Sequence, residues 1–310
     1  MCDITQHRLL CTNSLAILIV FLLSSCRDFE PQSVFNMKEE NEQIVVPCNN
    51  CDKTFEHNDI KRKYTLHVPK NLKKNAPLVF YLHGTGADAS KLEWMGLNKI
   101  ADTNGFVVVY PQGLPREAPW WKKGKSIWNS VRPESKPDDL GFLVALAEYL
   151  QQVYGLNPDR TFTSGNSNGG FMSYHLVAQR PDVFRASACL NSTVTGVTWR
   201  SRNDFSPVPI LQVSGALDKV IPVDGSLNKA GWGGAPDTKT IMEFWAELNE
   251  TKEKEIIQVT PNTLAYKYTG GKNGNEVWYY LIDDYGHGFP LGENGSINSM
   301  ELIWKFFSKF

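Results

Sequence analysis

A serine in a glycine-rich segment has the surroundings that nucleophilic chemistry needs. Ser167 is the centre of a Gly-x-Ser-x-Gly motif, with Gly165 before it and Gly169 after it. The motif lies between an expected strand over 160–164 and an expected helix over 169–180, which is the strand–turn–helix context of a nucleophile elbow. Such a turn leaves no room for side chains beside the serine, and the start of the helix favours negative charge. We therefore expect Ser167 to be a nucleophile, with a glycine-rich turn without catalysis as the alternative.

A histidine late in the chain can serve as the general base that a serine nucleophile requires. In an elbow of this kind the partners follow in the chain order Ser, Asp or Glu, His. Of the six histidines, only His175 and His287 come after Ser167. His175 falls inside the expected helix behind the elbow, so we expect it on the helix surface or in packing. His287 follows an expected strand over 277–282, and we expect it to be the base.

The carboxylate that orients the base should follow an earlier strand. The segment 210–214 has the apolar pattern of a strand, and Asp218 comes shortly after it. From that sheet edge Asp218 would accept the second imidazole N–H and stabilise the imidazolium. Asp224 lies beyond Pro222, further from the strand end. We expect Asp218 in this role and keep Asp224 as the alternative.

Two backbone N–H groups are expected to hold the developing oxyanion. One belongs to Asn168, directly after the nucleophile. The other belongs to Thr85, in the loop after an expected strand over 78–82, where Gly84 lets the backbone approach a substrate. His83 in the same loop is expected to make structural hydrogen bonds rather than to act as a second base.

Short apolar runs alternate with helical segments from residue 61 onward. Continuous apolar runs are typical of parallel strands that are buried on both faces. The alternation predicts a single α/β domain over 59–310, with a mainly parallel central sheet flanked by helices on both faces. The expected strands are 64–68, 78–82, 106–110, 160–164, 186–190, 210–214 and 277–282, and the expected helices are 87–104, 139–154, 169–180 and one that starts near Asn298.

The start of the chain has the pattern of a secretory signal. A basic residue precedes an apolar run over 15–23, which is too short to span a bilayer as a helix. The run ends in Leu-Ser-Ser-Cys, which resembles a bacterial lipoprotein processing box. We expect a signal peptide over 1–25, lipid on Cys26 and a flexible tether over 26–58, with an ordinary signal peptide as the alternative. The protein would then be secreted and lipid-anchored, periplasmic or at the cell surface, and would meet a membrane only through that anchor.

Three cysteines remain after such processing. Cys48 and Cys51 could form a local disulfide in an oxidising compartment. A redox pair is the weaker alternative, because no strand-to-helix context surrounds them. Two cysteines without a nearby histidine make a poor zinc site, so no metal is expected. Cys189 lies in an apolar run and is expected to be buried.

The composition is that of an ordinary globular protein. Of 310 residues, 42% are hydrophobic and 21% charged, which excludes disordered, collagen-like and multi-span membrane chains. The formal net charge of −1 gives no electrostatic reason to expect nucleic acid as a partner.

The ordered landmarks of the chain resemble the serine esterases of carbohydrate esterase family 1 and the related poly(3-hydroxybutyrate) depolymerase-like group. The resemblance runs from about Tyr64 to Phe310. It implies an α/β-hydrolase fold, hydrolysis of carboxylic esters and no cofactor. The chain departs from the family pattern at Thr85, where many relatives have Cys, and at Asn166, which replaces an apolar residue. The landmarks are Leu82-His83-Gly84, Val109-Tyr110-Pro111-Gln112-Gly113, Trp128-Asn129, Asp138-Asp139-Leu-Gly-Phe-Leu143, Gly165-Asn-Ser-Asn-Gly-Gly170, Gly215-Ala-Leu-Asp218 and Gly286-His287.

Three tryptophans are candidates for substrate binding. Trp120, Trp121 and Trp128 follow the strand that ends at Tyr110, on the expected side of the site, and their rings could stack on a feruloyl group or a sugar. Packing is the alternative, above all for Trp128. We expect removal of feruloyl or acetyl groups from plant polysaccharide fragments. Polyester hydrolysis is the alternative, followed by a peptidase of the same fold and a non-catalytic carbohydrate-binding lipoprotein.

Overall fold

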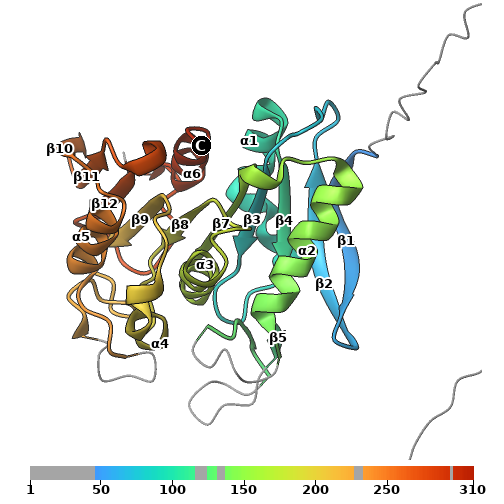
Figure 1. The fold of residues 1–310 in the computed structure, drawn as a ribbon, viewed down its shortest axis with the longest axis horizontal. Coiled ribbons are helices and arrows are strands. Elements are labelled where there is room, and N and C mark those ends of the chain that lie inside the picture. Colours follow the sequence, from blue (N-terminus) through green and yellow to red (C-terminus); the bar gives the residue numbers. More distant parts are fainter. Residues whose placement is uncertain (1–45, 116–123, 131–136, 227–232, 294–295) are drawn as a thin grey trace, which may run out of the picture. The chain divides into compact units, whose positions relative to one another are not determined.

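A ten-stranded mixed sheet forms the centre of the part of the protein that the computed structural model describes (Figure 1). The described residues are 46–115, 124–130, 137–226, 233–293 and 296–310. The strand order is β1-β2-β4-β3-β7-β8-β9-β12-β11-β10. The strands are β1 (Cys48–His57), β2 (Ile60–Val68), β3 (Leu78–Leu82), β4 (Val107–Pro111), β7 (Thr161–Asn166), β8 (Ala186–Leu190), β9 (Ile210–Gly215), β10 (Glu253–Thr260), β11 (Thr263–Thr269) and β12 (Val277–Ile282).

The middle of the sheet is parallel and each edge is an antiparallel hairpin. The strands β4, β3, β7, β8, β9 and β12 pair in parallel, while β1–β2 and β10–β11 form the two hairpins. All residues of β3 and β4 are buried, as expected for strands covered on both faces. The carboxyl ends of the six parallel strands therefore meet at one edge of the sheet.

Helices cover both faces of the sheet. Alternate side chains of β3 enter two separate cores: Phe80 packs with residues of α2, α3 and α5, and Tyr81 packs with residues of α1 and α6. This alternation is the period of two that a strand imposes. The helices are α1 (Leu97–Asn104), α2 (Asp139–Tyr154), α3 (Asn168–Gln179), α4 (Gly196–Arg200), α5 (Thr238–Leu248) and α6 (Ser299–Phe307), with 3₁₀ turns η1 (Ala89–Met95), η2 (Pro158–Arg160), η3 (Arg202–Asp204) and η5 (Lys272–Gly274), and a small hairpin of β5 (Leu114–Pro115) and β6 (Ser126–Ile127).

The predicted fold class and every predicted strand are confirmed, with ends shifted by a few residues at most. The helices predicted over 139–154 and 169–180 are confirmed as α2 and α3, and the last helix begins after the Asn298 cap as expected. The helix expected over 87–104 is divided into η1 and α1 at Gly96, whose φ of 88° lies in the left-handed region. The elements that were not predicted from the sequence are β1, the β5–β6 hairpin, α4, α5, β10 and β11.

The expected tether over 26–58 is too long, because its last part belongs to the sheet. β1 pairs with β2 over most of its length, and Phe55 packs against Phe142 of α2 at a ring-centroid distance of 6.3 Å. Cys48 and Cys51 form a disulfide inside β1. The compact unit extends over Gln43–Phe310. The predicted signal peptide and Cys26 lie outside the described residues.

Two kinds of feature are absent from the described residues. No helix there is long and apolar enough to cross a membrane. No group of three or more metal-binding side chains comes together there either. Cys189 is buried as expected, and burial raises the pKa of its thiol to about 12.

Candidate active site at the carboxyl edge of the sheet

Ser167 lies in a sharp turn between β7 and α3. Its φ of 51° and ψ of −122° are unusual for a residue with a side chain. The turn is packed tightly against the end of β3. A Cβ atom on Gly165 would lie 2.6 Å from the Leu82 carbonyl oxygen, and one on Gly169 would lie 2.0 Å from it. Only glycine fits at these two positions, so the motif has the geometry of a nucleophile elbow.

Asp218 and His287 are brought together at the same edge. Asp218 follows β9, His287 follows the neighbouring β12, and the His287 Nδ1 lies 2.7 Å from the Asp218 Oδ2. The other carboxylate oxygen of Asp218 accepts the backbone N–H groups of Val220 and Ile221, each at 2.8 Å. Because a carboxylate can only accept, the Nδ1 of His287 is the donor and its Nε2 is left to accept a proton. The buried Asp218 thus holds a histidine whose side chain is 23% exposed.

The loops that carry these two residues are tied to each other. The Leu217 N–H donates to the Tyr285 carbonyl at 2.9 Å. Asn191, after β8, accepts the Gly215 N–H with its side-chain oxygen and donates to the Gly288 carbonyl with its side-chain nitrogen. The alternative acid, Asp224, instead accepts the Ser226 N–H in an exposed turn. The structure therefore pairs Asp218, and not Asp224, with His287.

The Ser167 hydroxyl makes no hydrogen bond with a described residue, the His287 ring included. The backbone groups of Ser167 are both hydrogen-bonded. Its N–H donates to the Leu190 carbonyl at 2.9 Å, and its carbonyl accepts the Phe171 N–H at 3.1 Å. Such catalytic hydrogen bonds are often long in the absence of substrate and tighten when it binds. The three residues of the predicted triad all come from strand ends at the carboxyl edge of the parallel sheet.

The two predicted oxyanion donors, the N–H groups of Thr85 and Asn168, have no acceptor among the described residues. In the described part of the chain, the N–H of Thr85 has no acceptor, whereas the N–H of Gly86 donates to Ser126 at 2.7 Å. Asn168 is the first residue of α3, where backbone N–H groups lack a carbonyl within the helix. Both groups are therefore available to a negatively charged oxygen.

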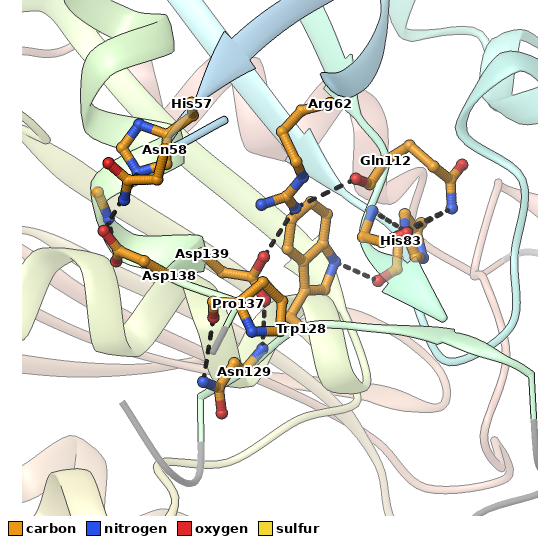
Figure 2. Close-up of polar contacts among 12 residues, drawn as sticks. His57, Asn58, Arg62, His83, Gln112, Trp128, Asn129, Pro137, Asp138 and Asp139 are labelled. Carbon is orange, nitrogen blue, oxygen red and sulfur yellow. Dashed lines mark hydrogen bonds and ion pairs between the residues drawn. The ribbon is translucent and has the colours of Figure 1, made fainter. Parts of the chain in front are cut away.

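His83 is a structural residue in the loop that carries Thr85, and its ring contacts the Gln112 side chain (Figure 2). Its Nε2 accepts the Gly113 N–H at 2.9 Å, so its Nδ1 carries the proton that it donates to the Gly84 carbonyl at 2.7 Å. Burial lowers the pKa of this imidazole, which keeps it neutral. His175 is likewise a packing residue. It is buried in α3 beside Thr198, and burial lowers its pKa to about 4.

The structure corrects the expectation for Trp128 and leaves two tryptophans undescribed. Trp128 is only 1% exposed, and its indole N–H donates to the His83 carbonyl at 3.0 Å. No face of this ring is free to stack on a substrate, so Trp128 is a packing residue. Trp120 and Trp121 lie outside the described residues.

Another tryptophan, Trp94, was not predicted as a site residue but contacts a residue two positions after the base. Trp94 in η1 is 61% exposed and packs edge-to-face on Phe289 at a ring-centroid distance of 5.5 Å. Phe289 is two residues after His287. Two more exposed apolar side chains, Leu217 and Val220, flank Asp218. The only sequence signal for Trp94 was its place in the long segment after β3, whose carboxyl end lies at the site.

The chain is similar in sequence to several known hydrolases. Residues 103–219 match the model of the prolyl oligopeptidase family. A poly(3-hydroxyalkanoate) depolymerase from Paucimonas lemoignei is 26% identical over 75% of this chain, and a bifunctional acetylxylan esterase/xylanase from Neocallimastix patriciarum is 31% identical over 82% of it. This chain covers only 59% and 35% of those two proteins. A probable feruloyl esterase from Aspergillus niger is 26% identical over 79% of this chain and 83% of its own length.

The fold recurs in solved structures. The acetyl xylan esterase from Aspergillus awamori superposes with a TM-score of 0.60 over 84% of this chain and 100% of its own, at 13% identity. A match at this identity shows the fold alone. The parallel sheet, the elbow between β7 and α3, and the order of acid and base along the chain are those of the α/β-hydrolase fold. The chain has this fold, and in sequence it resembles the serine esterases of carbohydrate esterase family 1 and the poly(3-hydroxybutyrate) depolymerase-like group.

Proposed function

We propose that the protein is a serine carboxylic-ester hydrolase with Ser167 as nucleophile, His287 as base and Asp218 as the residue that orients the base. One observation carries the proposal: the buried Asp218 holds the His287 ring at 2.7 Å, at the sheet edge where Ser167 occupies an elbow. A buried carboxylate, a partly exposed imidazole and a serine with a forced backbone conformation are the parts that acyl transfer requires.

The geometry supports a two-step mechanism. The His287 Nε2 takes the proton of the Ser167 hydroxyl as its oxygen attacks the ester carbonyl carbon. The N–H groups of Asn168 and Thr85 stabilise the oxyanion of the tetrahedral intermediate. The protonated His287 then gives its proton to the departing alcohol, and an acyl group remains on Ser167. Water, deprotonated by His287, attacks the acyl carbonyl, which releases the acid and restores the serine.

The substrate that we propose is a hydroxycinnamoyl or acetyl ester of a plant polysaccharide. The feruloyl and acetylxylan esterases among the similar proteins support this substrate class. The exposed Trp94 ring, which packs on Phe289, favours an aromatic acyl group, because an exposed indole can stack on a planar ring. Two observations favour other functions. The similarity to a polyhydroxyalkanoate depolymerase supports a polyester, and the match to the prolyl oligopeptidase model supports a peptide.

The test is a comparison of substrates on the purified protein. The panel is p-nitrophenyl acetate, methyl ferulate, acetylated xylan, a hydroxybutyrate trimer and a peptidyl p-nitroanilide, each assayed also with Ser167→Ala. We expect ester hydrolysis that falls by at least about three orders of magnitude in the variant. Turnover of the hydroxybutyrate trimer without turnover of methyl ferulate would contradict the substrate class. Cleavage of the anilide alone would replace the esterase with a peptidase.

We further propose that the protein is secreted and carries lipid on Cys26. The Leu-Ser-Ser-Cys sequence at residues 23–26 and the disulfide between Cys48 and Cys51 support export to an oxidising compartment. A Cys26→Ala variant expressed with labelled palmitate should lose the label that the unaltered protein acquires. An unlabelled wild-type protein would refute the anchor.

A further inference from the structure

A buried ion pair outside the triad is connected to both sides of the candidate oxyanion hole. Arg62 of β2 and Asp139 of α2 are each 1% exposed, and the Arg62 Nη2 lies 2.7 Å from the Asp139 Oδ1 (Figure 2). We infer that this pair positions the oxyanion donors of Asn168 and Thr85 by fixing Trp128 between them. The inference rests on the proposed esterase function.

Burying this ion pair costs free energy. Burial removes both charges from water, and replacing a buried ion pair with apolar residues is often neutral or stabilising. Burial lowers the pKa of Arg62. The guanidinium lies over the Phe142 ring, 4.0 Å from its centroid, so its surroundings are apolar as well as charged. A contribution to stability alone is thus a weak reason for a charged pair at this place.

The first connection runs from Asp139 to Trp128. The second carboxylate oxygen of Asp139 accepts the Asn129 N–H at 2.7 Å. The Asn129 side chain donates in turn to the Pro137 carbonyl, just before α2, at 3.2 Å. The segment at residues 128–129 is therefore attached to the start of α2 by a charge-assisted bond, the stronger class of hydrogen bond.

Trp128 then contacts the side chain of Asn168 and the loop that carries Thr85. Its backbone N–H donates to the Asn168 side-chain oxygen at 2.6 Å, and its carbonyl accepts from the Asn168 side-chain nitrogen at 3.3 Å. The Asn168 side-chain amide thus both accepts from and donates to the Trp128 backbone, as a residue of an adjacent strand would. The Trp128 indole donates to the His83 carbonyl at 3.0 Å, two residues before Thr85. One buried tryptophan thus fixes the residue after the nucleophile and the loop of the second donor.

Arg62 also supports the Thr85 loop by a second route. Its Nη2 donates to the Gln112 carbonyl at 3.4 Å. The Gln112 side-chain oxygen accepts the Ala89 N–H at 2.7 Å, and the next residue, Gly113, donates to the His83 ring. Oxyanion donors act only where they are held at the position of the developing charge, so a small displacement lowers the rate of the chemical step more than it lowers substrate binding.

The test separates positioning from stability. Asp139→Asn weakens the link to Arg62, and the double variant Arg62→Met/Asp139→Leu removes both charges together with the acceptor for Asn129. We expect kcat on p-nitrophenyl acetate to fall about 10–100-fold in both, with KM within about threefold. Affinity for a trifluoromethyl ketone, which reports on the oxyanion hole, should fall by a similar factor. The apolar double variant should be the more stable of the two.

The control is a buried polar residue at the amino ends of the parallel strands, away from the carboxyl edge that carries the site. Asn249 is buried after α5 and donates to the Val208 carbonyl at 2.9 Å, before β9 begins. Asn249→Ala should lower the melting temperature while kcat is unchanged. Full kcat in the double variant, or a loss in Asp139→Asn explained by its unfolded fraction, would overturn the inference and leave the proposed function intact. A wild-type protein without Ser167-dependent ester hydrolysis would overturn both.

Discussion

The two sides of the candidate site are built by different means. The nucleophile and oxyanion side rests on buried polar side chains, with His83 and Asn168 connected through Trp128 to a buried ion pair. On the acid–base side, a single side-chain contact, between Asp218 and His287, orients the base, in loops that expose Leu217 and Val220. The oxyanion donors are main-chain groups, which can be aimed only by fixing the backbone around them. A histidine is a side chain, which one carboxylate can aim while the surrounding loops stay free to contact substrate.

The largest effect is expected from breaking the contact between Asp218 and His287 on the acid–base side. In Asp218→Asn, the amide oxygen can still accept from Val220 and Ile221, but the amide group can no longer stabilise the imidazolium or fix the tautomer of His287. We expect kcat to fall by about three to four orders of magnitude, with little change in the melting temperature. Asp224→Asn is the control and should keep full activity. A greater loss in the control would identify Asp224 as the acid.

A glycine-to-alanine substitution on the nucleophile side and another on the acid–base side test whether the two sides differ in packing density. Gly169→Ala would place a Cβ 2.0 Å from the Leu82 carbonyl oxygen, whereas in Gly286→Ala the nearest atom, the Leu217 carbonyl oxygen, is 3.8 Å away. We expect Gly169→Ala to lower the free energy of unfolding by about 3 kcal/mol or more, and Gly286→Ala to change it by less than about 1 kcal/mol. Urea denaturation of the two variants measures both values. Equal destabilisation would show that the elbow is not the more tightly packed side.

The acid sensitivity of the fold should come from the nucleophile side. His175 in α3 has its pKa lowered by burial to about 4, against 6.5 for a free histidine. The unfolded chain therefore binds a proton that the folded chain excludes, so stability falls as the pH drops from about 6.5 to about 4. In His175→Gln this loss should shrink by up to about 3 kcal/mol, measured as the free energy of unfolding at pH 7.5 and pH 4.5. Parallel pH profiles of variant and wild type would contradict the assignment.

The smallest expected effect lies on the exposed acid–base side. Trp94→Ala removes the ring that packs on Phe289 beside His287. We expect kcat/KM for methyl ferulate to fall about fivefold, because ring stacking contributes roughly 1 kcal/mol, while p-nitrophenyl acetate is hydrolysed within about twofold of wild type. Tyr149→Ala, an exposed aromatic residue of α2, is the control for a general surface effect. An equal loss for both esters would place Trp94 in the structure of the loop rather than in substrate recognition.

The parts of the site that the sequence predicted depend on local context and chain order. The Gly-x-Ser-x-Gly turn requires only its flanking strand and helix, and His287 was selected by chain order together with the position of His175 inside a helix. Trp128 was different, because nothing local shows whether an indole after a strand will be buried under a loop from elsewhere. β1 was missed for a related reason. It is mostly polar, with Phe55 as its one large apolar residue, and its structure comes from pairing with β2. The ion pair of Arg62 and Asp139 joins residues 77 positions apart, which no sequence period reveals.

The backbone angles of Ser167 imply a conflict between the stability of the fold and its catalytic activity. A φ of 51° with a ψ of −122° suits glycine alone, and holding another residue there costs about 1–3 kcal/mol. Ser167→Ala keeps that cost, because alanine has the same Cβ atom, whereas Ser167→Gly removes it along with the hydroxyl. The inactive glycine variant should therefore resist heat better than the natural protein. The natural protein is therefore less stable than this variant would be, and the difference in free energy of unfolding is the cost of holding a hydroxyl in the elbow at the edge of the sheet.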